Sequence, residues 1–295
     1  MRNIFKKFIA LFVLYTLIAS VDSPFARADE KKVLLMKIEA EIDPRTNRYS
    51  ELALKEALEI GADLVIVEMD TYGGAVNDAD DIRTRMLEFE KPVVVFINKD
   101  AASAGALISI ACDSIYMAPG ASIGAATVVV ATGDAAPDKY QSYMRSIMRS
   151  TAEANGRDPK IAEAMVDQEI EIDSVTEAGK VLTFSTSEAI KHNFCEAEVK
   201  SVEEVIKRQG ITEYELVEFK LSATERIIKV FLNPFVSGIL ILIIIGGIYF
   251  ELQTPGVGFP ILASIAAAIL YFVPYYLNGL AANWEICLLY TSPSP

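Results

Sequence analysis

A serine with small neighbours is the first residue of this chain that could do covalent chemistry. Ser103 follows the β-branched run 93–97 and precedes the apolar run 107–112, a pattern that predicts a strand leading directly into a helix. The first N–H groups of a helix have no partner within it, so the N–H of Ala104 could receive the oxyanion formed when a serine attacks a carbonyl. Small residues also occur where a helix simply packs on a sheet, so this motif alone does not identify a site.

A second junction of the same kind lies earlier in the chain. The predicted buried strand at residues 64–69 is followed by the pair Gly73 and Gly74. Adjacent glycines after a strand let the backbone approach a ligand closely and turn its N–H groups toward it. The two junctions together predict half of an acyl-transfer site, with Ser103 as nucleophile and Gly73, Gly74 and Ala104 as the oxyanion hole.

A serine nucleophile also needs a base. The single histidine, His192, falls in an expected surface turn far along the chain, which argues against a Ser-His-Asp triad. A lysine acts as a base only as the neutral amine, so its pKa must lie well below the ordinary value of about 10.4. Lys139 follows a Pro-Asp pair that signals a helix start, where the helix dipole disfavours a cation. We therefore expect a Ser103/Lys139 dyad, with Asp167 or Glu169 as the candidate orienting carboxylate.

Three other lysines are weaker candidates for the base than Lys139. They are expected at a solvated strand end or on polar helix faces: Lys99, Lys160 and Lys180.

Composition narrows the class of protein. The 295 residues allow one large domain with additional segments. An apolar fraction of 52% and a mean hydropathy of +0.31 indicate membrane segments. The formal charge of −13 and the lack of a long basic run argue against nucleic-acid binding. Three cysteines without metal or disulfide spacing, and one histidine, give no reason to expect a metal or another cofactor.

The order of the predicted elements indicates an α/β fold. Strands alternate with helices, which predicts βαβ units and a largely parallel sheet. One helix is expected to begin with Ser50 as its N-cap and to end at Gly61, and another to span 139–154. Residues 125–138 lack periodicity, and we expect them to form a mobile loop beside the site.

Three regions follow from the pattern of charge and hydropathy. Residues 1–28 have the charged start, short apolar stretch and Ala-Arg-Ala end of a signal peptide, although the stretch could also remain as an uncleaved anchor. Residues 29–225 form the α/β domain. Residues 226–286 form a membrane region with helices at about 235–250 and 257–277 and a third helix cut short. Glycines in this region should let the helices pack closely.

The last nine residues differ from the rest of the chain. Residues 287–295 read as one translation frame of a common sequencing-adapter tag. We interpret them as a library artefact and expect the natural sequence to end near Ile286.

The two junctions, together with Ser122-Ile123-Gly124 and Lys139, resemble the NfeD family of membrane serine proteases. That family belongs to the ClpP/crotonase-fold group, which includes signal peptide peptidase A. The resemblance runs from about Lys32 to about Trp284, and departs at Tyr72, where many relatives carry proline. It implies a ClpP/crotonase-like fold, catalytic roles for Ser103 and Lys139, a membrane hairpin and stomatin-like (band 7) partners. Relatives often continue into a small soluble β-barrel domain.

These observations predict a serine endopeptidase anchored in the cell membrane by more than one helix, with its protease domain exported. The expected substrates are apolar segments of membrane-associated proteins, and a homo-oligomer is expected. Two alternatives stay open. One is a non-catalytic membrane scaffold that works with stomatin-like proteins. The other is a crotonase-type acyl-CoA enzyme, which would need a coenzyme A supply and acid/base carboxylates that the sequence does not locate.

Overall fold

The structure is a computed structural model that describes residues 30–172, 179–254, 256 and 258–277. The predicted signal peptide and the nine residues at the carboxyl end lie outside the described residues. The strands are β1 (Lys31–Ile38), β2 (Leu64–Thr71), β3 (Val93–Ala102), β4 (Ser114–Met117), β5 (Ser122–Gly124), β6 (Thr183–Ser185), β7 (Ala197–Glu198) and β8 (Tyr214–Glu218). The helices of the domain are α2 (Pro44–Ile60), α3 (Val76–Glu88), α4 (Ala104–Ile110), α5 (Asp138–Ala154), α6 (Pro159–Ala164), α7 (Thr186–Lys191) and α8 (Val202–Arg208). They are followed by α9 (Ala223–Phe231), α10 (Pro234–Gln253) and α11 (Phe259–Leu277).

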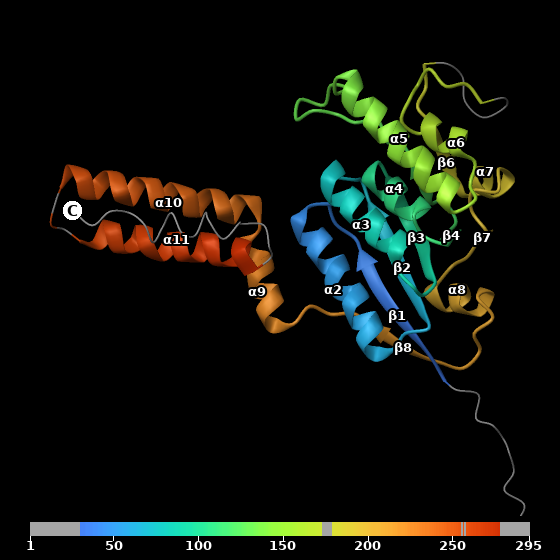
Figure 1. The fold of residues 1–295 in the computed structure, drawn as a ribbon, viewed down its shortest axis with the longest axis horizontal. Helices are drawn as coiled ribbons and strands as arrows, with labels where there is room; N and C mark the ends of the chain where they lie inside the picture. The colour runs from blue at the N-terminus through green and yellow to red at the C-terminus, as the bar shows by residue number, and fades with distance from the viewer. Residues whose placement is uncertain (1–29, 173–178, 255, 257, 278–295) are drawn as a thin grey trace, which may run out of the picture.

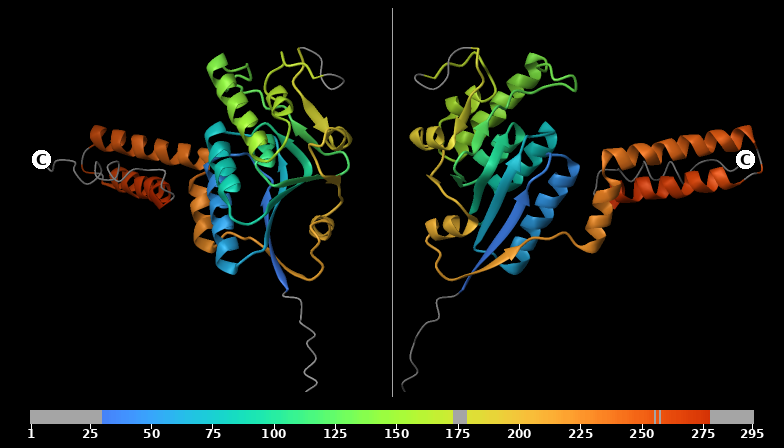
Figure 2. Two further views of the ribbon diagram at one scale, coloured as in Figure 1. Left: turned by 45° about the vertical axis from the view of Figure 1, so that its right-hand side comes forward. Right: turned by 180° about the vertical axis from the view of Figure 1, so that it is seen from behind.

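One sheet organises the domain (Figure 1). Its strands lie in the order β6-β5-β3-β2-β1-β8, and β4 pairs with both β3 and β7. Every pair is parallel except β5 with β6. Helices α2 and α3 cover one face, and α8 lies on the opposite side (Figure 2). Parallel strands need such crossover helices, so the sequence pattern and the architecture agree.

Strand β3 is longer than the sequence predicts. The β-branched run ends at Ile97, but the strand continues to Ala102. Its first part pairs with β4, and residues Asp100 to Ala102 pair with β5 instead. The hydroxyl of Ser122 also donates to the Asp100 carboxylate at 2.6 Å. This pairing depends on the tertiary fold. The local sequence does not predict it, because residues 98–100 are polar. Its result is that β3 ends directly at Ser103.

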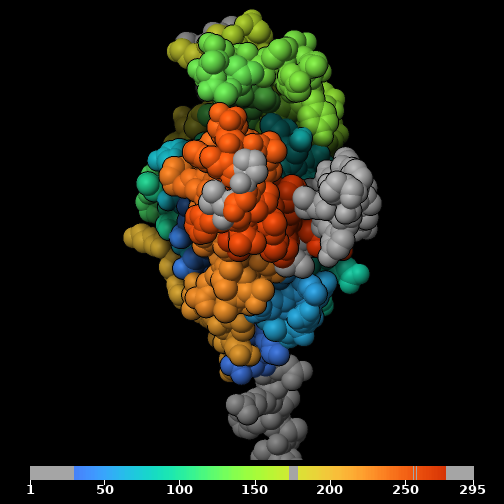
Figure 3. Space-filling model, turned by 90° about the vertical axis from the view of Figure 1, so that its left-hand side faces the viewer, coloured from blue at the N-terminus to red at the C-terminus, as the bar shows by residue number. Residues whose placement is uncertain are grey.

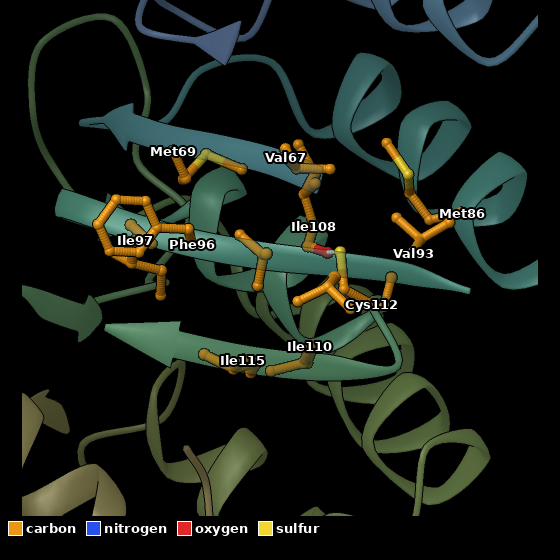
Figure 4. Close-up of a cluster of buried hydrophobic side chains, with 14 of the residues drawn as sticks. Val67, Met69, Met86, Val93, Phe96, Ile97, Ile108, Ile110, Cys112 and Ile115 are labelled. Atoms are coloured by element: carbon orange, nitrogen blue, oxygen red, sulfur yellow. Dashed lines mark hydrogen bonds between the residues drawn. The ribbon is translucent and has the colours of Figure 1, made fainter. Parts of the chain in front are cut away.

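The core beneath this junction is continuous and apolar (Figure 4). Side chains of β2, β3 and β4, such as Val67, Val95 and Ile115, are fully buried. Ile108 and Ile110 of α4 are also fully buried and lie against these strands. Burying an aliphatic side chain of this size contributes about 1.5–3 kcal/mol, so α4 is held against the sheet by its whole apolar length.

Helix α2 begins earlier than predicted. Asp43 is its N-cap, and the carboxylate accepts hydrogen bonds from the N–H groups of Arg45 and Thr46 at 2.9 and 3.1 Å. The predicted cap, Ser50, lies inside the helix, where its hydroxyl donates to the Asn47 carbonyl. That prediction was wrong because the Asp-Pro pair, a stronger start signal, precedes it. The predicted end at Gly61 is confirmed, with φ of 67°.

Helices α10 and α11 form a hairpin that extends away from the domain (Figure 1). With 20 and 19 residues they are each about 30 Å long, the thickness of a hydrocarbon bilayer core. They meet at Gly247, where a Cβ would overlap Ser264 and the carbonyl of Pro260. The Ser264 hydroxyl also lies 3.0 Å from the Ile244 carbonyl. This close approach is the small-residue packing that the sequence predicts.

Candidate active site

Ser103 has a strained backbone. Its φ of 55° and ψ of −116° lie in a region that residues other than glycine rarely adopt, at a cost of about 1–3 kcal/mol. Hydrogen bonds on both sides hold it there. The Ser103 N–H donates to the Gly124 carbonyl at 2.8 Å, and the Ser103 carbonyl accepts from Ala106 and Leu107. The strain sits at the turn from β3 into α4, where a serine side chain can be presented at the end of a sheet.

The glycine pair lies directly against this serine. A Cβ on Gly73 would stand 3.1 Å from Ser103 Oγ, and its φ of 109° is also unsuited to other residues. Gly74 is equally confined, because a Cβ there would overlap the backbone of Ile42. Ile42 holds the loop from both sides: its N–H donates to the Gly73 carbonyl, and its carbonyl accepts from Ala75. Glycine is therefore required at both positions by close approach.

A pocket of 170 Å³ brings the predicted groups together. Gly74, Ser103 and Ala104 line it, along with Val128 of the following loop and Met144 of α5. Within the described residues, the N–H groups of Gly74 and Ala104 have no protein acceptor. Two unpaired backbone donors beside a hydroxyl are the arrangement that stabilises an oxyanion.

The third predicted oxyanion donor is already engaged. The Gly73 N–H donates to the hydroxyl of Thr71 at 3.1 Å, and that hydroxyl donates to the Ala40 carbonyl at 2.7 Å. The Thr71 methyl group lies against Gly105 of α4. Thr71 thus connects the glycine loop to the helix after Ser103. Sequence reasoning missed it, since a threonine at the end of a strand is ordinary.

The far end of α4 is capped by side chains that the sequence did not single out. Nη1 of Arg157 lies 3.1 and 2.9 Å from the carbonyl oxygens of Ile110 and Cys112, and Asn155 contacts the same two oxygens. Burial lowers the pKa of the Arg157 guanidinium, and the carboxylate of Glu196, 3.7 Å away, opposes that shift. A cation at this end complements the helix dipole, and α4 is held with its amino end toward the pocket.

Lys139 lies in the first turn of α5, as predicted, but its side chain is exposed. Its Nζ stands 4.7 Å from the centroid of the Tyr140 ring. Lys139 is not among the residues that line the pocket, whereas Met144, about 7.5 Å further along the helix axis, is. No carboxylate within the described residues forms an ion pair with it. The structure therefore places the predicted base on the helix that borders the pocket, turned toward solvent.

The two candidate orienting carboxylates differ. Asp167 accepts from Arg145 at 3.0 Å, and Arg145 also pairs with Asp138 at 3.1 Å. Glu169 is exposed, and its N–H donates to the other oxygen of Asp167. Neither carboxylate contacts Lys139. Asp167 acts on the start of α5 through Arg145.

The loop before α5 has more structure than its sequence predicts. Val129 and Ala135 form a β-bridge across it. The side chain of Gln141 accepts from the Val128 N–H and donates to the Val128 carbonyl at 3.0 and 2.7 Å. Val129 itself remains exposed beside the pocket. An amide on α5 thus holds the loop in place, which the lack of periodicity could not reveal.

The remaining predicted features lie away from the serine pocket. His192 stacks on Phe184 with ring centroids 5.4 Å apart. Tyr72 is 77% exposed and borders a second hollow, which Gly74 also lines, together with Asp70 and Lys99. No group of three or more His, Cys, Asp or Glu side chains within the described residues is placed to hold a metal ion.

Two protein-family models match this chain. The model of the NfeD1b amino-terminal domain matches residues 32–219, well over half of the chain, and the model of the NfeD integral membrane domain matches residues 235–293. The chain belongs to the NfeD family. The second match and the two apolar helices together identify a membrane protein.

Two curated relatives of this NfeD chain are longer than it is. The membrane protein NfeD1b of Bacillus subtilis is 34% identical over 266 residues, which are 90% of this chain and 61% of the relative. The membrane-bound protease PH1510 of Pyrococcus horikoshii is 24% identical over 248 residues, covering 76% of this chain and 54% of the relative. The chain thus spans about three fifths and about half of their lengths.

Solved structures share the fold of the NfeD domain. A serine-to-alanine mutant of 1510-N, a membrane-bound stomatin-specific protease, matches with a TM-score of 0.57 and 25% identity over 65% of this chain and 99% of its own. A lysine-to-alanine mutant of 1510-N in complex with a substrate peptide matches with a TM-score of 0.59 and 24% identity over 68% and 98%. The predicted α/β fold is confirmed.

Proposed function

We propose that this NfeD protein is a membrane-anchored serine endopeptidase in which Ser103 attacks the peptide carbonyl. The observation that carries the proposal is the strained Ser103 in one pocket with the unpaired N–H groups of Gly74 and Ala104. In the reaction, the Ser103 oxygen bonds to the carbonyl carbon and the carbonyl oxygen becomes an oxyanion held by those two amides. The amine then leaves with a proton, and water hydrolyses the acyl-enzyme.

Lys139 is the base in this proposal. As the neutral amine it takes the proton of Ser103 and passes it to the leaving amine. To do so, its side chain must turn from the Tyr140 ring toward the pocket when a substrate is bound. A cation–π contact at an exposed site is worth only about 0.5–1 kcal/mol, so this rotation is inexpensive. Asp167 contributes indirectly, because its pairing with Arg145 holds the start of α5.

The substrate proposal rests on where the pocket lies. Val128 and Val129 line one side of it, and Val129 is exposed, so an extended apolar segment can lie along this loop. The domain is joined to a membrane hairpin, which favours substrates that are themselves membrane-associated. We propose stomatin-like proteins as partners, since 1510-N, which shares the fold, is a stomatin-specific protease. We also propose that the chain begins with a signal peptide, that the protease domain is exported and that the protein forms a homo-oligomer.

The nucleophile is tested by labelling the full-length chain in detergent with a fluorophosphonate probe. Wild type should form a covalent adduct at Ser103, and Ser103→Ala should form none. Ser109→Ala is the matched control, since Ser109 is buried in α4 and its hydroxyl only donates to the Gly105 carbonyl. An adduct on Ser103→Ala equal to that of wild type, or none on wild type, contradicts the proposal.

The base is tested by replacing Lys139 with alanine and with arginine. Arginine keeps the cation but stays protonated, so both variants should lose peptide cleavage. Lys160→Arg, on the neighbouring α6, is the control and should cleave normally. Cleavage by Lys139→Arg at a rate comparable to wild type would show that another group is the base.

A further inference from the structure

Helix α9 lies between the domain and the hairpin and runs across the base of α10 and α11 rather than in line with them (Figure 1). If the hairpin spans a bilayer, a helix in this position lies along the membrane surface. Seen along the hairpin, α9 lies beside the hairpin base and is open to the viewer (Figure 3). Its surface on that side is therefore available to lipid.

The sequence of α9 separates two faces. Ala223, Ile227 and Val230 recur at helical spacing on one face, and Ile227 and Val230 are 60% and 56% exposed. Ile228, about 100° around the helix axis from Ile227, is buried and lines a small hollow with Arg48 and Tyr49 of α2. Large aliphatic side chains on the exposed face of a nine-residue helix have no protein to cover them within the described residues.

Two cations lie on one side of the exposed apolar face, and Lys229 also lines the small hollow with Arg48 and Glu225. Arg226 and Lys229 are exposed, one turn apart on the same side of α9. Within the described residues neither forms an ion pair with a carboxylate. In a chain with a formal charge of −13, a pair of unneutralised cations beside a membrane hairpin is complementary to anionic headgroups.

Both ends of α9 are fixed. On the domain side, Glu225 pairs with Arg48 of α2 at 3.2 Å. On the membrane side, the Ser237 hydroxyl donates to the Phe231 carbonyl at 2.9 Å and lies 3.2 Å from the hydroxyl of Tyr275 in α11. These contacts set the rotation of α9 about its own axis, so its exposed face has a defined direction.

We propose that α9 is an in-plane membrane-surface helix. Ile227 and Val230 enter the boundary between headgroups and acyl chains, and Arg226 and Lys229 bind the phosphates of anionic lipids. The occupant of this face is the bilayer that holds the hairpin, since α9 lies at the base of α10 and α11 and carries two cations without a carboxylate partner within the described residues. This inference does not depend on peptide hydrolysis, and it fixes the orientation of the domain over the membrane.

The test uses the full-length chain reconstituted in phosphatidylcholine vesicles with or without phosphatidylglycerol. Val230→Cys, in a Cys287→Ser background, carries a bimane label that is quenched by doxyl-labelled lipid. Lys207→Cys on α8, on the far side of the sheet, is the control position. Quenching should be at least about twofold stronger at position 230 than at 207. Equal quenching at both positions overturns the proposal.

Two further measurements distinguish the bilayer from a protein surface as the occupant of the exposed face of α9. Arg226→Gln/Lys229→Gln should reduce the extra quenching that phosphatidylglycerol causes, whereas the matched pair Lys207→Gln/Arg208→Gln should not. If the label at position 230 is protected from aqueous iodide but not quenched by doxyl lipid, a protein surface such as a second copy of the chain covers α9, and the bilayer is not its occupant.

Discussion

Gly73 lies so close to Ser103 that a Cβ on the glycine would stand 2.6 Å from the Cβ of the serine. The contact joins two segments that are separated in the chain by α3 and β3. It means that the position of the glycine loop and the position of Ser103, the proposed nucleophile, cannot change independently. The site behaves as one packed object, and substitutions in either segment should affect both.

Replacement of Gly73 by alanine should therefore abolish fluorophosphonate labelling, because Ser103 must shift to make room. Gly120→Ala is the matched control: Gly120 also has positive φ, at 80°, but its Cβ would meet nothing within 4 Å. Gly120→Ala should lose about 1–2 kcal/mol of unfolding free energy from backbone strain, and Gly73→Ala should lose more, because its Cβ also overlaps Ser103. Only Gly73→Ala should lose labelling, and full labelling of that variant would contradict the geometry of the site.

Thr71→Val should lower the labelling rate without removing Ser103. The substitution keeps the methyl contact with Gly105 but removes the hydroxyl that accepts from the Gly73 N–H and donates to the Ala40 carbonyl. Leaving these groups unpaired costs about 1–3 kcal/mol. Thr151→Val, which removes a buried hydroxyl from α5, should cost a similar amount in thermal unfolding but leave labelling unchanged. Equal labelling of the two variants would argue against a positioning role for Thr71.

The two described cysteines should be unreactive in the folded protein. Burial raises the pKa of the Cys112 thiol and of the Cys195 thiol to about 12 in each case. The thiols therefore stay protonated at pH 8.5, where a free cysteine is about half ionised. In a Cys287→Ser background, iodoacetamide should label neither residue at pH 8.5 until the chain is denatured.

The raised thiol pKa values should also make the folded protein less stable as pH rises. Each folded-state pKa lies above the unfolded value, so the unfolded chain loses the thiol proton first as pH rises. The free energy of unfolding should then fall by about 1.4 kcal/mol per pH unit for each thiol, from about pH 8.5 toward 12. If mass spectrometry detects rapid iodoacetamide labelling of Cys112 or Cys195 in the folded chain, the burial of these residues is contradicted.

The hairpin offers a test with adjacent residues. Gly247→Leu should separate α10 from α11, because even a Cβ there would overlap Ser264. Gly246→Leu should be tolerated, since a Cβ on Gly246 meets nothing within 4 Å. Thermal unfolding in detergent, followed by circular dichroism, should show a lower midpoint for Gly247→Leu alone. The same midpoint for both variants would mean that the helices do not meet at Gly247.

Local patterns predicted the parts of the structure that local interactions determine. The strand after Leu64, the end of a helix at Gly61 and the start of α5 near Lys139 all follow from residue type and spacing. The helix N-cap was assigned to Ser50 rather than Asp43 because two start signals compete within a few residues.

Other features depend on contacts across the fold. The extension of β3 to Ala102 depends on pairing with β5, and the role of Thr71 depends on where Ala40 lies. Arg157 is separated from α4 by β4, β5 and the whole of α5, so the local sequence does not predict that it caps the carbonyl of Ile110. The direction of the Lys139 side chain, whose Nζ lies over the Tyr140 ring, is also not predicted by the sequence pattern. The sequence predicts which chemical groups form the candidate site, and the structure describes the packing around them.

The Gly124 carbonyl that holds Ser103, and Met144 that closes the pocket, both lie downstream of the serine itself. A chain emerging from the ribosome presents its amino end first, and domains fold as units once their segments are available. The proposed nucleophile is therefore synthesised before the residues that complete the proposed site. Under the proposed mechanism Ser103 becomes reactive only after the chain has passed residue 144, and a nascent or truncated product that stops short of Gly124 should carry an inert Ser103.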